Sequence, residues 1–157
     1  PEEGLGAQPA GFERVRVSVE SDATRMAALE RELVGIEREA DYRYFHENAQ
    51  RVWRTCVSER LDGSLDGFLV SVAHPACTML GPGVARDEAT ALALIVAQLD
   101  QLRGSTPVWL VPSDRPALTS ALYALGARNC ELHLAQVLGE AAPPSGVVMP
   151  TFLPETG

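Results

Sequence analysis

The sequence predicts a mixed α/β (α+β) domain: a mostly antiparallel central sheet flanked by helices, with one parallel strand pair in its middle. Apolar and polar residues alternate over 14–20, the period of a half-buried strand. Two strand-like segments at 52–59 and 68–73 flank a turn rich in Asp and Gly, which indicates an antiparallel hairpin. Over 77–104, a strand runs through a turn into a long apolar helix, and a second strand–helix pair follows.

Two helices are expected between the first strand and the hairpin. The first begins at Ser21 or Asp22, residue types that cap helix N-termini, and Gly35 is a natural stop for it. A charged second helix continues over 36–48. These elements precede the hairpin, so the antiparallel part of the sheet forms from the first half of the chain.

The second half is expected to alternate strands and helices. A buried strand at 77–80 ends in a glycine-proline turn at 81–83, and the helix after it closes at Gly104. The next pair is a strand at 108–112 and a helix at 117–127. Because strands that are joined through a helix run parallel, this half supplies the parallel pair.

Two extended segments are expected near the C-terminus. A strand at 129–139 is broken by a Pro-rich stretch, and a short strand or edge-packing tail follows at 147–153. Pro150 lacks the N–H that a central strand needs, so this last segment belongs at an edge. The predicted organisation is therefore a linker or arm at 1–12, a domain at 13–140 and a C-terminal tail at 141–157.

Composition narrows the class of protein. The chain has 157 residues, enough for one domain with a sizeable core, and 46% of them are hydrophobic. Its net charge of −8 argues against nucleic acid as the main partner, because phosphate contacts need clustered Lys and Arg. All 13 cations are arginines. No apolar run is long enough to suggest a membrane span. Three widely spaced cysteines suit free thiols in a reducing cytoplasm, and a start at Pro1 suggests part of a longer protein.

Three stretches of the chain resemble the GNAT acyltransferase superfamily, over roughly residues 13–140. In the hairpin, Gly67 stands at the place of that family's usual glycine. The sequence TMLGPGVARDEATALALI at 78–95 is similar to the family's cofactor strand, pyrophosphate loop and helix. The sequence SDRPALTSALYALGARNCELHLAQV at 113–137 resembles the helix and strand that follow.

A closer likeness is to the divergent GNAT domain that forms the C-terminal half of tandem acetyltransferases. Such domains carry an early G-x-(acid)-R motif, a G-P-x-V-A-x-D loop and a Pro-rich tail. The matching residues here are Gly35, Glu37 and Arg38 for the first motif, and Gly81, Pro82, Val84, Ala85 and Asp87 for the second. This resemblance implies an upstream GNAT domain as a partner, or a homodimer.

The resemblance implies an acetyl-CoA-dependent N-acetyltransferase, in which a small-molecule or peptide amine attacks the thioester directly. Acetyl-CoA would lie where the strand at 77–80 and the strand at 108–112 diverge. Its expected contacts are Met79, Leu80, Gly81, Pro82, Gly83, Val84, Ala85, Arg86 and Thr90. The alternative is a catalytically degenerate GNAT-fold domain that serves as the ligand-binding or interaction half of a tandem protein.

The loop departs from the family's glycine pattern, because Glu88 and Thr90 stand where its glycines belong. One carboxylate about 6 Å from a phosphate charge costs on the order of 3 kcal/mol at an effective dielectric constant of ~20. Arg86 is placed to offset one such cost. The other interpretation of Asp87 and Glu88 is an acid-capped helix N-terminus without a phosphate site.

Three residues are candidates for catalysis. Tyr123 is the candidate acid for the departing thiolate, although Gly126 puts Leu122 in the register that the family uses. A core or surface tyrosine is the other interpretation. Glu59 and His74 are candidate bases, because each ends a strand near the expected site. Either side chain is also typical of a solvated strand end.

The second helix carries the candidate substrate residues Arg38, Tyr42 and Tyr44, since helices at this point frame the acceptor pocket in the resembling fold. A charged, solvated helix face is the alternative. No metal is expected, because Cys130 and His133 would point to opposite faces of a strand. Zinc binding and a cysteine nucleophile are the remaining, weaker hypotheses.

Overall fold

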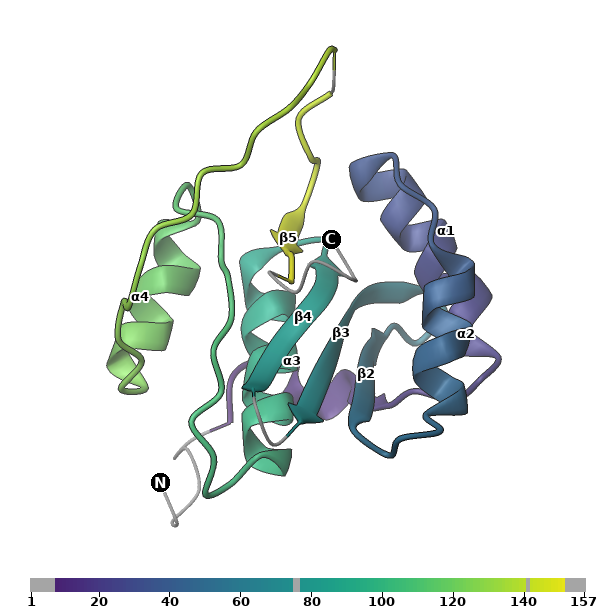
Figure 1. Cartoon of the computed structure of the whole chain (residues 1–157), viewed down its shortest axis with the longest axis horizontal. Coiled ribbons are helices and arrows are strands. Elements are labelled where there is room, and N and C mark those ends of the chain that lie inside the picture. Colours follow the sequence, from purple (N-terminus) through teal and green to yellow (C-terminus); the bar gives the residue numbers. More distant parts are fainter. Residues whose placement is uncertain (1–7, 75–76, 141, 152–157) are drawn as a thin grey trace.

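The computed structural model describes residues 8–74, 77–140 and 142–151 (Figure 1). Most of the expected linker and the end of the expected tail lie outside these residues. The elements, in chain order, are a short 3-10 helix (Phe12–Arg14), β1 (Val15–Val17), α1 (Asp22–Val34), α2 (Glu39–Glu47), β2 (Trp53–Glu59), β3 (Leu65–His74), β4 (Cys77–Ala85), α3 (Glu88–Gln101), α4 (Pro116–Ala124) and β5 (Val147–Met149).

The five strands form one sheet in the order β1-β2-β3-β4-β5, and every neighbouring pair is antiparallel. The antiparallel hairpin expected from the sequence is confirmed as β2 and β3, and β3 is longer than the predicted 68–73. The parallel element is a single bridge between Met79 and Val108. The predicted mixed fold is therefore confirmed, with its parallel component reduced to one contact.

Helices cover both faces of the sheet (Figure 1). On one face, α1 and α2 pack on side chains such as Val57, Phe68 and Val84. On the other, α3 and α4 enclose a second core that contains Leu69, Leu80 and Met149. Because successive side chains of a strand alternate between the faces, both layers are built from the same strands.

The strand predicted at 108–112 is wrong, because the segment leaves β4 after the bridge at Val108. The strand predicted at 129–139 is also wrong, since these residues form neither helix nor strand. Leu132 and Leu134 are instead 82% and 88% exposed. The physical reason is a missing partner: β5 takes the edge of β4 beyond Val108, so neither apolar segment has a strand to pair with.

The turn predicted at 81–83 is wrong as well, because β4 continues through it to Ala85. Gly81 has a φ of 124°, in the region that favours glycine, and a cis peptide joins it to Pro82. Gly81 and Pro82 together stand opposite the single β3 residue Val70, which is a β-bulge. A glycine-proline pair that normally signals a turn here bends a strand without ending it.

Gln98 of α3 satisfies backbone groups around this bulge. Its side chain is fully buried, and its amide donates to the carbonyl oxygen of Leu69 over 2.7 Å and to that of Arg54 over 3.3 Å. Its carbonyl oxygen accepts from the hydroxyl of Ser71 over 2.9 Å. One side chain therefore ties α3 to two strands at the point where the register shifts.

We expect Gln98→Leu to lower the free energy of unfolding by about 2–4 kcal/mol, because at least two buried polar groups lose their partner. Chemical denaturation followed by circular dichroism measures this change. Gln50→Leu, at an exposed turn position, is the control and should change stability by less than about 0.5 kcal/mol. Equal stability of the two variants would contradict the role given to Gln98.

Candidate functional site

The outer edge of β4 is the place where the sequence predicts a cofactor, and main-chain groups of the same chain occupy it. Near its start, the Leu80 N–H donates to the Val108 carbonyl oxygen, and the Val108 N–H donates to the Thr78 carbonyl oxygen, both over 3.0 Å. Near its end, 83–85 pairs with β5, with Gly83 opposite Met149. The other edge of β4 pairs with β3 along its length. Main-chain partners from the same chain therefore lie along both edges of β4.

β5 fits closely against β4 because two glycines remove side chains at the contact. A Cβ on Gly81 would lie 2.7 Å from the carbonyl oxygen of Pro150, and one on Gly146 would collide with that of Ala85. Val147 and Met149 are buried in the core shared with α3 and α4. Burying a side chain of this size contributes roughly 1.5–3 kcal/mol, so β5 is a packed part of this conformation.

The two carboxylates that follow β4 cap helices. Asp87 is the N-cap of α3, and its Oδ1 accepts from the Thr90 N–H over 2.7 Å. Glu88 reaches α4, where its Oε2 accepts from the Leu118 N–H over 2.5 Å. The acid-capped helix N-terminus, one of the two interpretations of these residues, is therefore present in this loop. The Glu88 side chain also accepts from the N-terminal part of a second helix, α4. The amide at Thr90 that an anion would use is already bonded to Asp87.

Arg86, the expected phosphate contact, is held by carboxylates. Its guanidinium donates to Glu32 of α1 and lies 3.9 Å from Asp66. Hydrogen bonds from Arg86 lower the pKa of the Glu32 carboxyl and correspondingly raise that of Arg86. Asp66, whose side chain is 4% exposed, also pairs with Arg14 and Arg60. Arg86 is therefore part of an ion-pair cluster that joins α1, β3 and the loop after β4.

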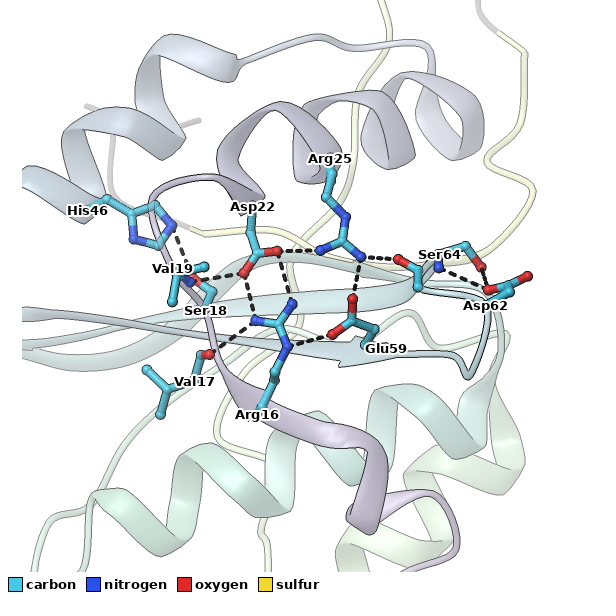
Figure 2. Close-up of polar contacts among 11 residues, drawn as sticks. Arg16, Val17, Ser18, Val19, Asp22, Arg25, His46, Glu59, Asp62 and Ser64 are labelled. Atoms are coloured by element: carbon cyan, nitrogen blue, oxygen red, sulfur yellow. Dashed lines mark hydrogen bonds and ion pairs between the residues drawn. The ribbon is translucent and has the colours of Figure 1, made fainter.

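Glu59, a predicted base, belongs to the network drawn in Figure 2. It accepts from Arg16 and Arg25, over 2.6 Å in each case, and these hydrogen bonds lower the pKa of its carboxyl. A general base works best with a pKa near the operating pH, so this shift has the wrong direction for catalysis. Glu59 instead ties the end of β2 to β1 and α1.

The centre of the same network is Asp22, at the start of α1 (Figure 2). Its side chain is 1% exposed and accepts from Arg16, Arg25 and the Val19 N–H. Burial alone would raise the pKa of this carboxyl, but the hydrogen bonds from Arg16 and Val19 outweigh burial and hold it below its usual value. Asp22 is therefore an ionised residue on which β1 and α1 converge.

His46 lies beside this network, with its Nε2 3.0 Å from the Ser18 hydroxyl oxygen (Figure 2). Burial lowers the pKa of its imidazole. The pair borders a surface hollow of about 330 Å³, at the end of the sheet where β2 begins, that is also lined by Trp53 and Arg54. This hollow contains no β4 residue and is separate from the predicted cofactor site.

The other predicted catalytic residues lie apart from one another. His74 is exposed at the end of β3, opposite Cys77. Tyr123 is 53% exposed on α4, whereas its neighbour Leu122 is buried. The α4 register therefore turns Leu122 toward the core. The structure does not bring Glu59, His74 and Tyr123 together around one reacting atom.

Two of the three predicted substrate residues converge on a buried carboxylate. Arg38 and the hydroxyl of Tyr42 both donate to Glu30 of α1. Tyr42 is fully buried, and burial together with the Glu30 hydrogen bond raises the pKa of its phenol. Tyr44 is half exposed and packs edge-on against Trp53. Arg38 and Tyr42 thus fix α2 to α1.

The residues present do not fit acetyl-CoA in this conformation. The β4 edge that would pair with an amide-bearing arm is paired with β5, and Asp87 takes the Thr90 amide at the start of α3. Among the described residues, no group of three or more His, Cys, Asp or Glu side chains is placed to hold a metal ion. No helix within the described ranges has the length and apolar character of a membrane span.

Sequence reasoning missed the ion-pair networks and the pairing of β5 with the end of β4. A local signal for the network around Asp22 was the spacing of Asp22 and Arg25, three apart on a helix. Ion pairs between residues far apart in the sequence, such as Arg16 with Glu59, cannot be recognised from sequence spacing. For the second, Gly81 and Gly146 were visible, but their shared role depends on contacts across more than sixty residues of chain.

Comparisons with known proteins agree with this architecture. The sequence model of a family described as an acetyltransferase (GNAT) domain matches residues 26–144. Among curated proteins, none matches the sequence.

Solved structures share the fold at low identity. A ribosomal-protein-alanine N-acetyltransferase from Brucella melitensis has a TM-score of 0.51 and 18% identity, covering 80% of this chain and 99% of its own. An aminoglycoside 6'-N-acetyltransferase from Acinetobacter baumannii has a TM-score of 0.53 and 13% identity, covering 80% and 98%. An aminoglycoside N-acetyltransferase in complex with CoA has a TM-score of 0.53 and 14% identity, covering 79% and 93%.

We expect Asp22→Asn to lower the free energy of unfolding at pH 7 by about 2–3 kcal/mol, because two guanidinium groups lose a buried partner. Since the folded-state pKa of Asp22 is depressed, its contribution is full above the unfolded-state pKa, about 3.9, and is lost as pH falls below it. The variant's stability should therefore fall less steeply below about pH 5 than that of the wild type.

Urea denaturation between pH 3 and 7 measures both effects. Asp41→Asn, at an exposed position on α2, is the matched control and should retain the wild-type acid dependence. If the free energy of unfolding fell equally steeply with decreasing pH in wild type and Asp22→Asn, the assignment of Asp22 as the network's centre would be contradicted.

Proposed function

The chain belongs to the GNAT acetyltransferase family, and on that basis we propose that it works without acetyl transfer of its own, as the ligand-binding or interaction half of a tandem protein. The observation that carries the proposal is the pairing of β4 along both edges, with β5 seated on 83–85. An amide-bearing thioester arm would need those main-chain groups. The pairing therefore argues against turnover by this conformation.

The placement of the candidate catalytic residues supports the same proposal. The Glu59 carboxylate is bonded to two guanidinium groups, and Tyr123 lies at the surface of α4. The helices that would frame an acceptor pocket are instead joined through Glu30, Arg38 and Tyr42. The Glu59, Arg38 and Tyr42 side chains therefore have structural partners.

A second candidate function is acetyl-CoA-dependent N-acetyl transfer to a small-molecule or peptide amine. It is favoured by the parallel bridge between Met79 and Val108, beyond which the two segments separate. In this case β5 must leave, and Met79, Leu80, Gly81–Arg86 and Thr90 remain the proposed cofactor contacts, with Arg38, Tyr42 and Tyr44 toward the acceptor. Glu59 or His74 would be the base and Tyr123 the acid.

Partners and location are proposed on the same grounds. An upstream GNAT domain, or a second copy of the chain, would complete a composite site in the tandem arrangement. Cys56, Cys77 and Cys130 are free thiols, which supports the proposed location in the reducing cytoplasm.

We expect acetyl-CoA and CoA to leave the melting temperature of the chain unchanged, within about 1 °C, at millimolar concentration. A ligand at a hundred times its Kd would stabilise the fold by about 2.7 kcal/mol and raise the melting temperature by roughly 5–10 °C. Differential scanning fluorimetry gives this measurement, with ADP as the control for non-specific anion binding.

Acetylation of an amine panel by the isolated chain would overturn the proposal and favour the second candidate. Activity that arises only when an upstream GNAT domain is added, with neither part active alone, is the outcome expected for a composite site.

A further inference from the structure

We propose that the tail strap, defined as residues 146–151 and containing β5, is a built-in competitor that keeps the outer edge of β4 closed. When the strap is displaced, the main-chain groups of 83–85 become available to an extended ligand that carries amide groups, and coenzyme A is the probe of that class. This inference rests on the proposed function, because it names the contact that prevents cofactor binding.

The first argument is steric fit. Gly146 and Gly81 lie on opposite sides of the contact, one on the strap and one on β4, and a side chain at either position would strike backbone of the other segment. Gly146 has no unusual φ that would itself require glycine, so its lack of a side chain is explained by the close approach to Ala85. The two surfaces are therefore matched to each other.

The second argument is anchorage at the start of the strap. The Arg115 guanidinium, at the start of α4, donates to the Gly146 carbonyl oxygen over 3.0 Å. Just before the strap, the Ser145 N–H donates to the Leu33 carbonyl oxygen at the end of α1 over 2.9 Å. The strap thus enters between α1 and α4 and then runs antiparallel to the end of β4 (Figure 1).

The third argument is that the strap can leave without dismantling the domain. Between α4 and Ser145, the described residues contain no helix or strand, and most of 128–140 is exposed (Figure 1). β1–β4 pair with one another independently of β5, and the strap adds only Val147 and Met149 to the buried apolar core. Release therefore removes a short edge strand and leaves the remaining sheet intact.

The fourth argument is what release would uncover. The bridge to Val108 ends at Leu80, so the edge beyond the bulge has no other pairing segment among the described residues. An uncovered strand edge is a row of donors and acceptors that pairs readily with an extended chain. The Asp87 cap of α3 lies directly after this edge and keeps the Thr90 amide, so the ligand contact that release provides is the main chain of 83–85.

The test uses the full chain with Gly146→Val, which pushes the strap from β4 without deleting an apolar residue. Ala142→Val, at an exposed position before the strap, is the matched control. Hydrogen–deuterium exchange reports the amides of 83–85, and isothermal titration reports CoA affinity. If the open form is populated at roughly 1% in the wild type, unseating the strap should raise apparent CoA affinity by up to about a hundredfold.

The expected result is faster exchange at 83–85 in Gly146→Val, unchanged exchange in β2, and CoA binding that Ala142→Val lacks. A peptide of sequence SGVVMPT, residues 145–151, should then compete with CoA. Faster exchange without CoA binding would overturn the strap as the barrier while leaving the proposed function intact. CoA binding by the wild type with exchange at 83–85 still slow would refute both.

A second variant covers the case in which Gly146→Val fails to fold. A chain that ends at Ser145 removes the strap altogether and is measured by circular dichroism and the same titration. A folded truncated chain that binds CoA supports the proposal. Unfolding of both variants would show that β5 is an obligatory part of the core, and would overturn the proposal.

Discussion

A β-strand carries hydrogen-bonding groups along two edges, and both edges of β4 must find partners. β3 supplies one edge throughout, while Val108 and β5 divide the other between them. The bulge at Gly81 and Pro82 separates those two pairings, and Gln98 donates to the carbonyl oxygen of Leu69 beside it. The exposure of 128–140 and the closed site follow from how this outer edge is shared.

Electrostatics reinforces the same arrangement. Each of three buried carboxylates, Asp22, Glu30 and Asp66, interacts with at least two side chains. Every cationic partner is a guanidinium, whose planar fork matches a carboxylate better than an ammonium does. Because breaking one partner of a buried pair leaves a charge uncompensated, these clusters hold α1 and α2 in place. Charged residues that suggested a catalytic surface are structural here.

Much of the fold could be predicted from local pattern. The Gly35 stop and the hairpin between β2 and β3 depend on neighbours in sequence, and the structure contains both. A strand also forms where the valines alternate, but it covers only Val15–Val17 of the predicted 14–20, and Val17 is 64% exposed. The strands expected at 108–112 and 129–139 depend on a distant partner. Their apolar patterns are genuine, but β5, which comes later in the chain, takes the edge that they would have used.

The candidate site was less predictable for the same reason. Position in the chain identified β4 and the loop after it, and the acid cap at Asp87 was one of two interpretations that the residues allowed. The pairing of Glu59 with Arg16 and Arg25, and the burial of Tyr42, arise from contacts between elements far apart in sequence. No local spacing encodes them.

The exclusive use of arginine has a practical consequence for a member of an acetyl-transfer family. With no lysine in its sequence, the chain offers no side-chain amine to an activated acyl group. Non-enzymatic acylation of the protein, a common background in such assays, is therefore confined to other nucleophiles. Mass spectrometry can then assign an acetyl group on an added amine acceptor without correction for modified lysines.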